Sequence, residues 1–205
     1  ARGAAPTCDP DRPSGRPLPA ATLPAMASDL LLPLTRLYLE PHRHYHSLEH
    51  IAHMLHAGRE FPLDDVQTMA IWFHDAIYDP RSKRNEEDSA ALAGRLLRAN
   101  GWAEADVQRV ERIVLDTKLH QPTVAGAAAV LDLDLMSLAL PWPEFARNTE
   151  RIRAEFAHVP EADFRAGRGN FFRGMLARER LFFTPFGERL EPLARANLQR
   201  AAAAE

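Results

Sequence analysis

Histidine residues gather in one short stretch of this chain. Six of the nine histidines lie between His42 and His56. Histidine is the commonest metal-binding side chain and also exchanges protons near neutral pH. His46, His50 and His53 are spaced so that a helix would carry all three imidazoles on one face. The spacing predicts one wall of a metal site, although a solvated histidine-rich helix surface would look the same.

A second pair of ionisable residues, His74 and Asp75, stands inside the apolar run 71–77. An isolated carboxylate is costly to bury, so buried charges are usually paired or bound to metal. This run therefore also predicts a metal site, the alternative being an Asp75–histidine pair that serves only structure. Trp72 and Phe73 in the same run are predicted to be core residues rather than a stacking surface for a nucleobase.

A distant carboxylate is available from the run Leu131-Asp132-Leu133-Asp134-Leu135. The alternation of Asp and Leu would suit a short strand. On a helix, Asp132 and Asp134 would point to different sides, so only one of them would face a metal.

Composition narrows the class of protein. The chain has 205 residues, 46% of them hydrophobic and 26% charged, which predicts one globular domain with an ordinary core. The net charge of −3 argues against stable nucleic-acid binding. No apolar run approaches the ~18–20 residues that cross a bilayer, so we expect no membrane partner. The single Cys8 excludes an internal disulfide and fits a cytoplasmic protein.

The chain order suggests a tail followed by helices. Residues 1–27 are rich in Pro, Ala and Arg and are predicted to be a disordered extension, and residues 28–205 to be the domain. Helical periodicity and end signals then predict an all-α bundle of about eight helices. Ser28 could cap the first helix, and Asp64 with Gln67 has the pattern of a capping box. The predicted helical segments are 30–39, 44–57, 64–77, 86–100, 104–117, 127–140, 143–158, 161–183 and 186–203.

Taken in order, these motifs resemble the HD-domain superfamily of metal-dependent phosphohydrolases. His50, then His74-Asp75, then a late Asp is similar to the H…HD…D signature of that superfamily. The resemblance is closest to a predicted HD phosphohydrolase family known mostly from bacterial genomes. It covers about residues 30–200 and is carried by the segments 40–51, 73–80, 85–90, 117–120, 131–135 and 194–198. The implied fold is all-α, in agreement with the periodicity.

The resemblance implies a divalent metal site with the ligands His50, His74, Asp75 and Asp134. Comparison with Asp-Ala-Asp motifs in related HD proteins favours Asp134 over Asp132. Nitrogen and oxygen ligands suit Mn, Fe, Co, Ni or Zn, with Mg as a further candidate. The Tyr45-His46-x-x-x-His50 spacing is similar to that of cyclic-nucleotide phosphodiesterases and implies His46 as a proton donor.

Two departures from known HD branches limit what the resemblance implies. The chain lacks the additional histidine and acidic positions of dimetal cyclic-dinucleotide phosphodiesterases, so a mononuclear site is expected, although His46, His53 and His120 leave room for a second metal. Tyr78 stands where the deoxynucleotide monophosphatase branch has Glu in His-Asp-x-x-Glu. The substrate therefore cannot be transferred from either branch.

Other candidate residues follow from the chemistry of phosphate. Glu86 or Glu87 could accept a proton from water, although acidic residues also favour a helix start. Phosphate needs cationic or hydrogen-bonding partners. Lys118 is the first candidate as a catalytic cation, and the candidate substrate contacts are Arg43, Lys83, Arg84 and His120. The remaining charged groups are expected on the surface or around the site: His42, His44, His53, His56, His158, Arg165 and Arg168.

Together these observations predict an enzyme, a metal-dependent phosphohydrolase that cleaves a phosphate ester or anhydride of a small molecule. A nucleotide is the favoured substrate class, and a homodimer is compatible with the sequence. One alternative is a metal- or nucleotide-binding HD module without turnover. Another is a structural helical protein in which the apolar setting of His74 and Asp75 has no chemical role.

Overall fold

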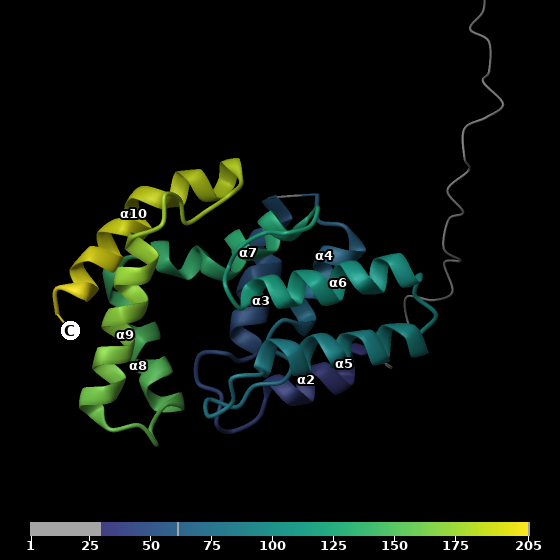
Figure 1. The fold of residues 1–205 in the computed structure, drawn as a ribbon, viewed down its shortest axis with the longest axis horizontal. Helices are drawn as coiled ribbons and strands as arrows, with labels where there is room; N and C mark the ends of the chain where they lie inside the picture. Colours follow the sequence, from purple (N-terminus) through teal and green to yellow (C-terminus); the bar gives the residue numbers. More distant parts are fainter. Residues whose placement is uncertain (1–29, 61, 205) are drawn as a thin grey trace, which may run out of the picture.

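The structure, a computed structural model, describes residues 30–60 and 62–204, which form helices joined by turns (Figure 1). The α-helices of this part are α2 (Leu32–Tyr38), α3 (Leu48–Ala57), α4 (Asp65–Phe73), α5 (Asn85–Ala99), α6 (Glu104–Thr117), α7 (Ala127–Leu135), α8 (Trp142–Glu155), α9 (Glu161–Leu176) and α10 (Pro185–Ala202). Two short 3₁₀ helices, η2 (Gly58–Glu60) and η3 (Met136–Ala139), accompany them. These residues contain no strand, so the predicted all-α fold is confirmed.

Two hydrophobic clusters organise the helices. The first is built from α2 to α7 and includes the buried Tyr38 and Phe73. The second is built from η3, α8, α9 and α10 and includes Phe172. Leu133 belongs to the first cluster and Leu135 to the second, so α7 connects them. Figure 1 shows α8, α9 and α10 on one side of the molecule and α2 to α6 on the other.

Local signals explain several helix ends. The predicted capping box at α4 is present: the Asp64 carboxylate accepts from the Gln67 backbone N–H at 2.7 Å, and the Gln67 side chain accepts from the Asp64 N–H at 2.9 Å. At α10, Thr184 caps the helix by accepting from the Gly187 N–H, with Pro185 in the first position. The bounds of α6 are those predicted from periodicity.

Other predicted bounds are wrong. Residues 41–47 are turns and bends rather than the start of a helix, because Ser47 is extended and α3 begins at Leu48. The predicted face of three histidines therefore does not exist, since His46 precedes the helix. Gly167 does not interrupt α9, but this helix ends at Leu176 rather than at Phe183.

The last predicted helix is continuous through Pro192. The strand alternative for 131–135 is excluded, because this run is the end of α7. The Ser28 cap and the predicted disordered extension lie outside the described residues.

Candidate metal centre

Three side chains from distant segments converge beneath a cavity: His50 of α3, His74 just after α4, and Asp134 of α7. One ligand atom from each lies within 4.8 Å of the other two. His50 Nε2 is 3.1 Å from Asp134 Oδ1, and His74 Nε2 is 3.7 Å from the same oxygen. Atoms bonded to one ion at ~2.0–2.2 Å lie about 3–3.5 Å apart. The three groups are therefore close to the spacing of a shared ion.

The imidazole of His74 is held in a defined tautomer. Its Nδ1 lies 2.9 Å from the carbonyl oxygen of Ile71, which can only accept, so Nδ1 carries the proton. Nε2 is left as the atom that can bind metal. It is buried and makes no hydrogen bond within the described structure, although Asp75 Oδ2 lies 3.0 Å away. A buried nitrogen without a hydrogen bond, facing carboxylates, fits a metal ligand.

The charges around this nitrogen favour a cation. Burial lowers the pKa of His74, but Asp75 and Asp134 outweigh it and raise the pKa to about 9. Burial raises the pKa of Asp134, but hydrogen bonds from His120 and His50 bring it well below its ordinary value. The pKa of Asp75 is likewise lowered, against burial, by His74 and His46. Two ionised carboxylates thus face two imidazoles, and the donor set fits a divalent transition metal.

The two aspartates of α7 have different surroundings. Asp132 is fully buried and accepts from the Phe183 N–H at 2.8 Å, the Thr184 N–H at 2.7 Å and the Thr184 hydroxyl at 2.6 Å. All its hydrogen bonds go to the start of α10, whereas Asp134 faces the histidines. The preference for Asp134 as the ligand therefore fits the geometry, and Asp132 has a structural position.

His46 forms a tight pair with Glu155 of α8. His46 Nδ1 lies 2.7 Å from Glu155 Oε2, and the Tyr78 hydroxyl donates to the same oxygen at 2.8 Å. Glu155 Oε1 accepts from three successive backbone N–H groups, those of His44, Tyr45 and His46, at 2.7–2.9 Å. Burial raises the pKa of Glu155, but these donors lower it to about 2. The buried carboxylate fixes both the loop and the imidazole.

The predicted substrate contact of Arg43 does not fit its position. Its side chain has no exposed surface. The guanidinium donates to the carbonyl oxygens of His46 at 3.1 Å, Asp75 at 2.7 Å and Ala76 at 2.9 Å. It also donates to Glu40 at 3.0 Å. Arg43 therefore holds together the two loops that carry His46 and the His74-Asp75 pair.

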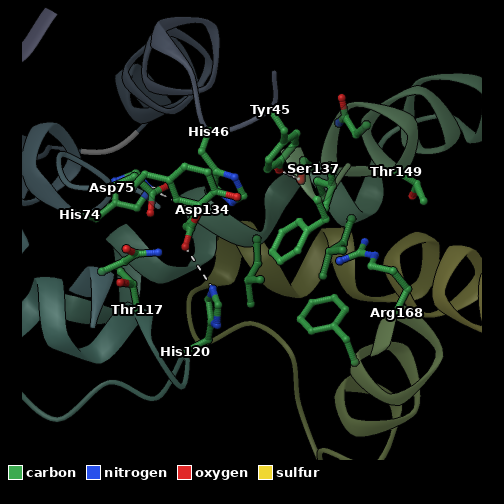
Figure 2. A pocket seen from close by; sticks show the side chains of 18 of the residues that line it. Tyr45, His46, His74, Asp75, Thr117, His120, Asp134, Ser137, Thr149 and Arg168 are labelled. Atoms are coloured by element: carbon green, nitrogen blue, oxygen red, sulfur yellow. Dashed lines mark hydrogen bonds and ion pairs between the residues drawn. The ribbon is translucent and has the colours of Figure 1, made fainter. Parts of the chain in front are cut away.

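A cavity of about 340 Å³ opens above the cluster (Figure 2). The part of the chain built on the first hydrophobic cluster, α2 to α7 with their loops, forms one helical group. It supplies ionisable residues to the cavity wall, including His46, His74, Asp75, Glu86, His120 and Asp134. The second helical group, built on the second cluster, supplies aromatic and polar residues from α8 and α9. The cavity therefore lies between the two groups, with the candidate metal centre at one end.

The predicted cations Lys83 and Lys118 do not line this cavity. Lys118 Nζ donates to the Lys83 carbonyl at 2.8 Å and to Glu87 at 2.5 Å, and lies 3.5 Å from Glu86. The ammonium group is thus engaged with α5 outside the cavity, which does not fit direct contact with substrate. Glu86 does line the cavity and remains the better candidate of the two glutamates for a proton acceptor. Arg84 is exposed beside Asp88.

His120 lies closer to the cluster than the sequence indicated. Its Nε2 is 3.1 Å from Asp134 Oδ2, the oxygen that does not face His50 (Figure 2). The backbone at His120 is left-handed, with φ of 47°, and Arg178 donates to its carbonyl at 3.2 Å. His120 was predicted as a substrate contact, and this position also orients the Asp134 carboxylate.

The remaining histidines lie around or away from the cluster. His42 stacks on Tyr78 and contacts its carbonyl oxygen at 2.9 Å. His53 and His56 line a second cavity of about 390 Å³, which shares Asp134 with the first. His158 is exposed and stacks on Phe156.

Sequence reasoning missed Glu155 and the cavity wall formed by α8 and α9. Glu155 stands in an amphipathic helix with other charged residues, and nothing in its local pattern marks it as buried. Arg168 was assigned to the helix surface, yet it lines the cavity. Tyr78 was noted only as a departure from a family motif, and its hydroxyl completes the surroundings of Glu155.

Comparisons with protein-family models, with curated proteins and with solved structures found no match. In the described part of the chain, none of the helices combines the length and the apolar character needed to cross a membrane.

Proposed function

We propose that this chain is a metal-dependent phosphohydrolase of the HD type, acting on a small phosphorylated molecule, with a nucleotide as the favoured substrate class. The observation that carries the proposal is the convergence of His50, His74 and Asp134, of which His74 and Asp134 line the cavity. The motif resemblance suggests the reaction class, and the spacing of the three side chains beside a cavity supports the proposal.

The site residues divide into metal ligands and residues that transfer protons. His50, His74 and Asp134, with Asp75 beside them, would hold Mn, Fe, Co, Ni or Zn. When bound, such an ion lowers the pKa of water and polarises a phosphate oxygen. The ordered imidazoles and the two ionised carboxylates need little rearrangement to receive it, because Ile71 fixes the tautomer of His74.

His46 is the proton donor in this proposal. Burial lowers its pKa, but the carboxylates of Asp75 and Glu155 outweigh burial and the net shift is upward. A protonated imidazole lining the cavity can donate to a leaving oxygen. Glu155 accepts from His46 Nδ1, which leaves Nε2 as the donating atom. Glu86, also on the wall, would accept the proton of the attacking water.

The test is phosphate release by purified protein supplied in turn with each of these metals, across nucleotides and simple phosphate esters. His74→Ala and Asp75→Ala should each abolish both metal content and turnover. His158→Ala, an exposed histidine remote from the cluster, is the matched control. Unchanged hydrolysis after both site substitutions would contradict the proposal, and nucleotide binding without product under every metal would favour the non-catalytic module.

A further inference from the structure

The cavity continues well beyond the candidate metal centre. Its far wall comes from α8 and α9 and combines three aromatic rings with three polar side chains. The rings are those of Phe145, Phe156 and Phe171, and the polar groups are Asn148, Thr149 and Arg168. In Figure 2, Thr149 and Arg168 lie on the side of the cavity opposite His74 and Asp75.

Arg168 is the one Lys or Arg among the described residues that line this cavity. Its guanidinium carbon lies 4.9 Å from the ring centre of Phe171 and 4.6 Å from that of Phe172. Such cation–π contacts hold a planar guanidinium in place. The positive charge therefore has a defined position in a wall that is otherwise apolar or neutral.

The two ends of the cavity have opposite character. Two carboxylates, those of Asp75 and Asp134, lie beside His74 at the end that would hold the metal, and the arginine lies at the other. A ligand consisting of phosphate alone would contact only the metal end. The volume of about 340 Å³ falls near the lower limit of ligand pockets, ~300–1,000 Å³. The cavity thus suits one molecule of mononucleotide size.

We propose that the α8–α9 wall is the recognition subsite for the organic part of the substrate, and that Arg168 is its specificity-determining residue. This inference rests on the proposed function only for the position of the phosphate. The ligand class is a phosphate compound with a planar ring that packs on the aromatic side chains. The ring carries a carbonyl, ring nitrogen or other acceptor for the Arg168 guanidinium. Asn148 and Thr149 supply neutral hydrogen-bonding groups beside it, as a nucleobase requires.

The probes are adenosine monophosphate, cytidine monophosphate and p-nitrophenyl phosphate, with glycerol phosphate as the probe that lacks a ring. Two variants change the subsite: Arg168→Met removes the charge, and Arg168→Lys keeps it without the planar fork. Arg165→Met is the matched control, since Arg165 is exposed one turn earlier on α9 and donates to the Ala204 carbonyl. Circular dichroism checks the fold of each variant.

Two readouts separate the subsite from the chemistry. Calorimetric binding to metal-free protein measures affinity without turnover, and steady-state phosphate release with metal measures KM and kcat. In Arg168→Met, ring-bearing probes should bind at least about tenfold more weakly and show a correspondingly higher KM, because a hydrogen bond to a charged group is lost. Arg168→Lys should lie between this variant and the wild type. The kcat/KM for glycerol phosphate should stay within about twofold of the wild type.

Each outcome decides one claim. Failure of every ring-bearing probe to bind the wild type, or equal affinity in Arg168→Met and Arg165→Met, would overturn the subsite. An equal loss of kcat/KM for ring-bearing and ring-free probes would also overturn it. If ring-bearing ligands bind in an Arg168-dependent way but are never hydrolysed, the result would support the subsite and contradict the proposed hydrolase activity.

Discussion

Arg43 joins the loop that carries His46 to the loop that carries His74 and Asp75, through hydrogen bonds to the carbonyls of His46, Asp75 and Ala76. We expect Arg43→Met to lower the free energy of unfolding by about 3 kcal/mol, because several buried carbonyl groups lose their donor. Metal content should fall with it. Denaturant unfolding and metal analysis measure both effects, with the exposed Arg36→Met as control. A variant with wild-type stability and metal but a selectively raised KM would restore the substrate-contact interpretation.

The contact between His46 and Glu155 leads to a prediction about the pH dependence of the reaction rate. Glu155→Gln keeps an oxygen acceptor for the backbone N–H groups of residues 44–46 but removes the negative charge from beside the imidazole. The pKa of His46, raised by Asp75 and Glu155 against burial, should then fall. The protonated donor is lost at lower pH, so the alkaline limb of the pH–rate profile should move to lower pH.

The same substitution should lower kcat by about 10–100-fold while metal content stays unchanged. The exposed Glu150→Gln on the same helix is the matched control. An alkaline limb at the wild-type position would mean that His46 is not the proton donor.

At the scale of single residues, the candidate ligands could be chosen from residue type and order alone, because His and Asp in apolar runs are chemically conspicuous. Arg43 was recognised as a cation but given the wrong surroundings, and Glu155 was not recognised. Both make buried contacts across more than 30 positions of sequence, such as Arg43 to Asp75 and Glu155 to His46. Local pattern carries no information about such contacts.

Helix α7 serves two purposes through two aspartates two positions apart. Asp132 binds the start of α10 through three hydrogen bonds, and Asp134 faces the histidines. Asp132→Asn should destabilise the fold by about 1–3 kcal/mol, because an amide cannot accept at both former carboxylate oxygens. Metal content of the folded protein should be retained. Thermal unfolding and metal analysis check this, with Asp134→Asn expected to lose the metal and to unfold at the temperature of the metal-free wild type.

A result in which Asp132→Asn loses metal without losing stability would contradict the assignment of the two aspartates.

The helices themselves were largely predictable, since α6 and the capping box of α4 follow from periodicity and end signals. The exceptions are informative. The loop 41–47 has helical spacing of its histidines but is held by Arg43 and Glu155. Helix α9 ends at Leu176, where Arg195 donates to the carbonyls of Leu176 and Arg178. In both cases tertiary hydrogen bonds override a local pattern.

On the scale of the whole molecule, the cavity lies between two helical groups that α7 connects. All-α architecture could be derived from sequence, but which helices face one another across the cavity could not, because periodicity marks a buried face and not its partner. Asp75 and Asp134 carry negative charge at the base of this interface. A bound cation is therefore expected to stabilise the fold as well as the site.

Metal removal tests this expectation. Chelation with EDTA should lower the melting temperature of the wild type, by an amount equivalent to ~2.7 kcal/mol when metal was present at 100 times its Kd. Readdition of the metal should restore it. Asp134→Asn should show no response to either treatment. A chelator-insensitive wild type that is free of metal would favour a purely structural role for the cluster.

The most direct test of the central claim is metal analysis of the purified wild-type protein and of His50→Ala, His74→Ala and Asp134→Asn, with phosphate release measured on the same samples. His158→Ala, an exposed histidine that lines neither cavity, is the control. We predict a stoichiometric transition metal and hydrolysis in the wild type and the control, and loss of both in the three variants. Retention of metal and of full hydrolysis in all three would contradict it.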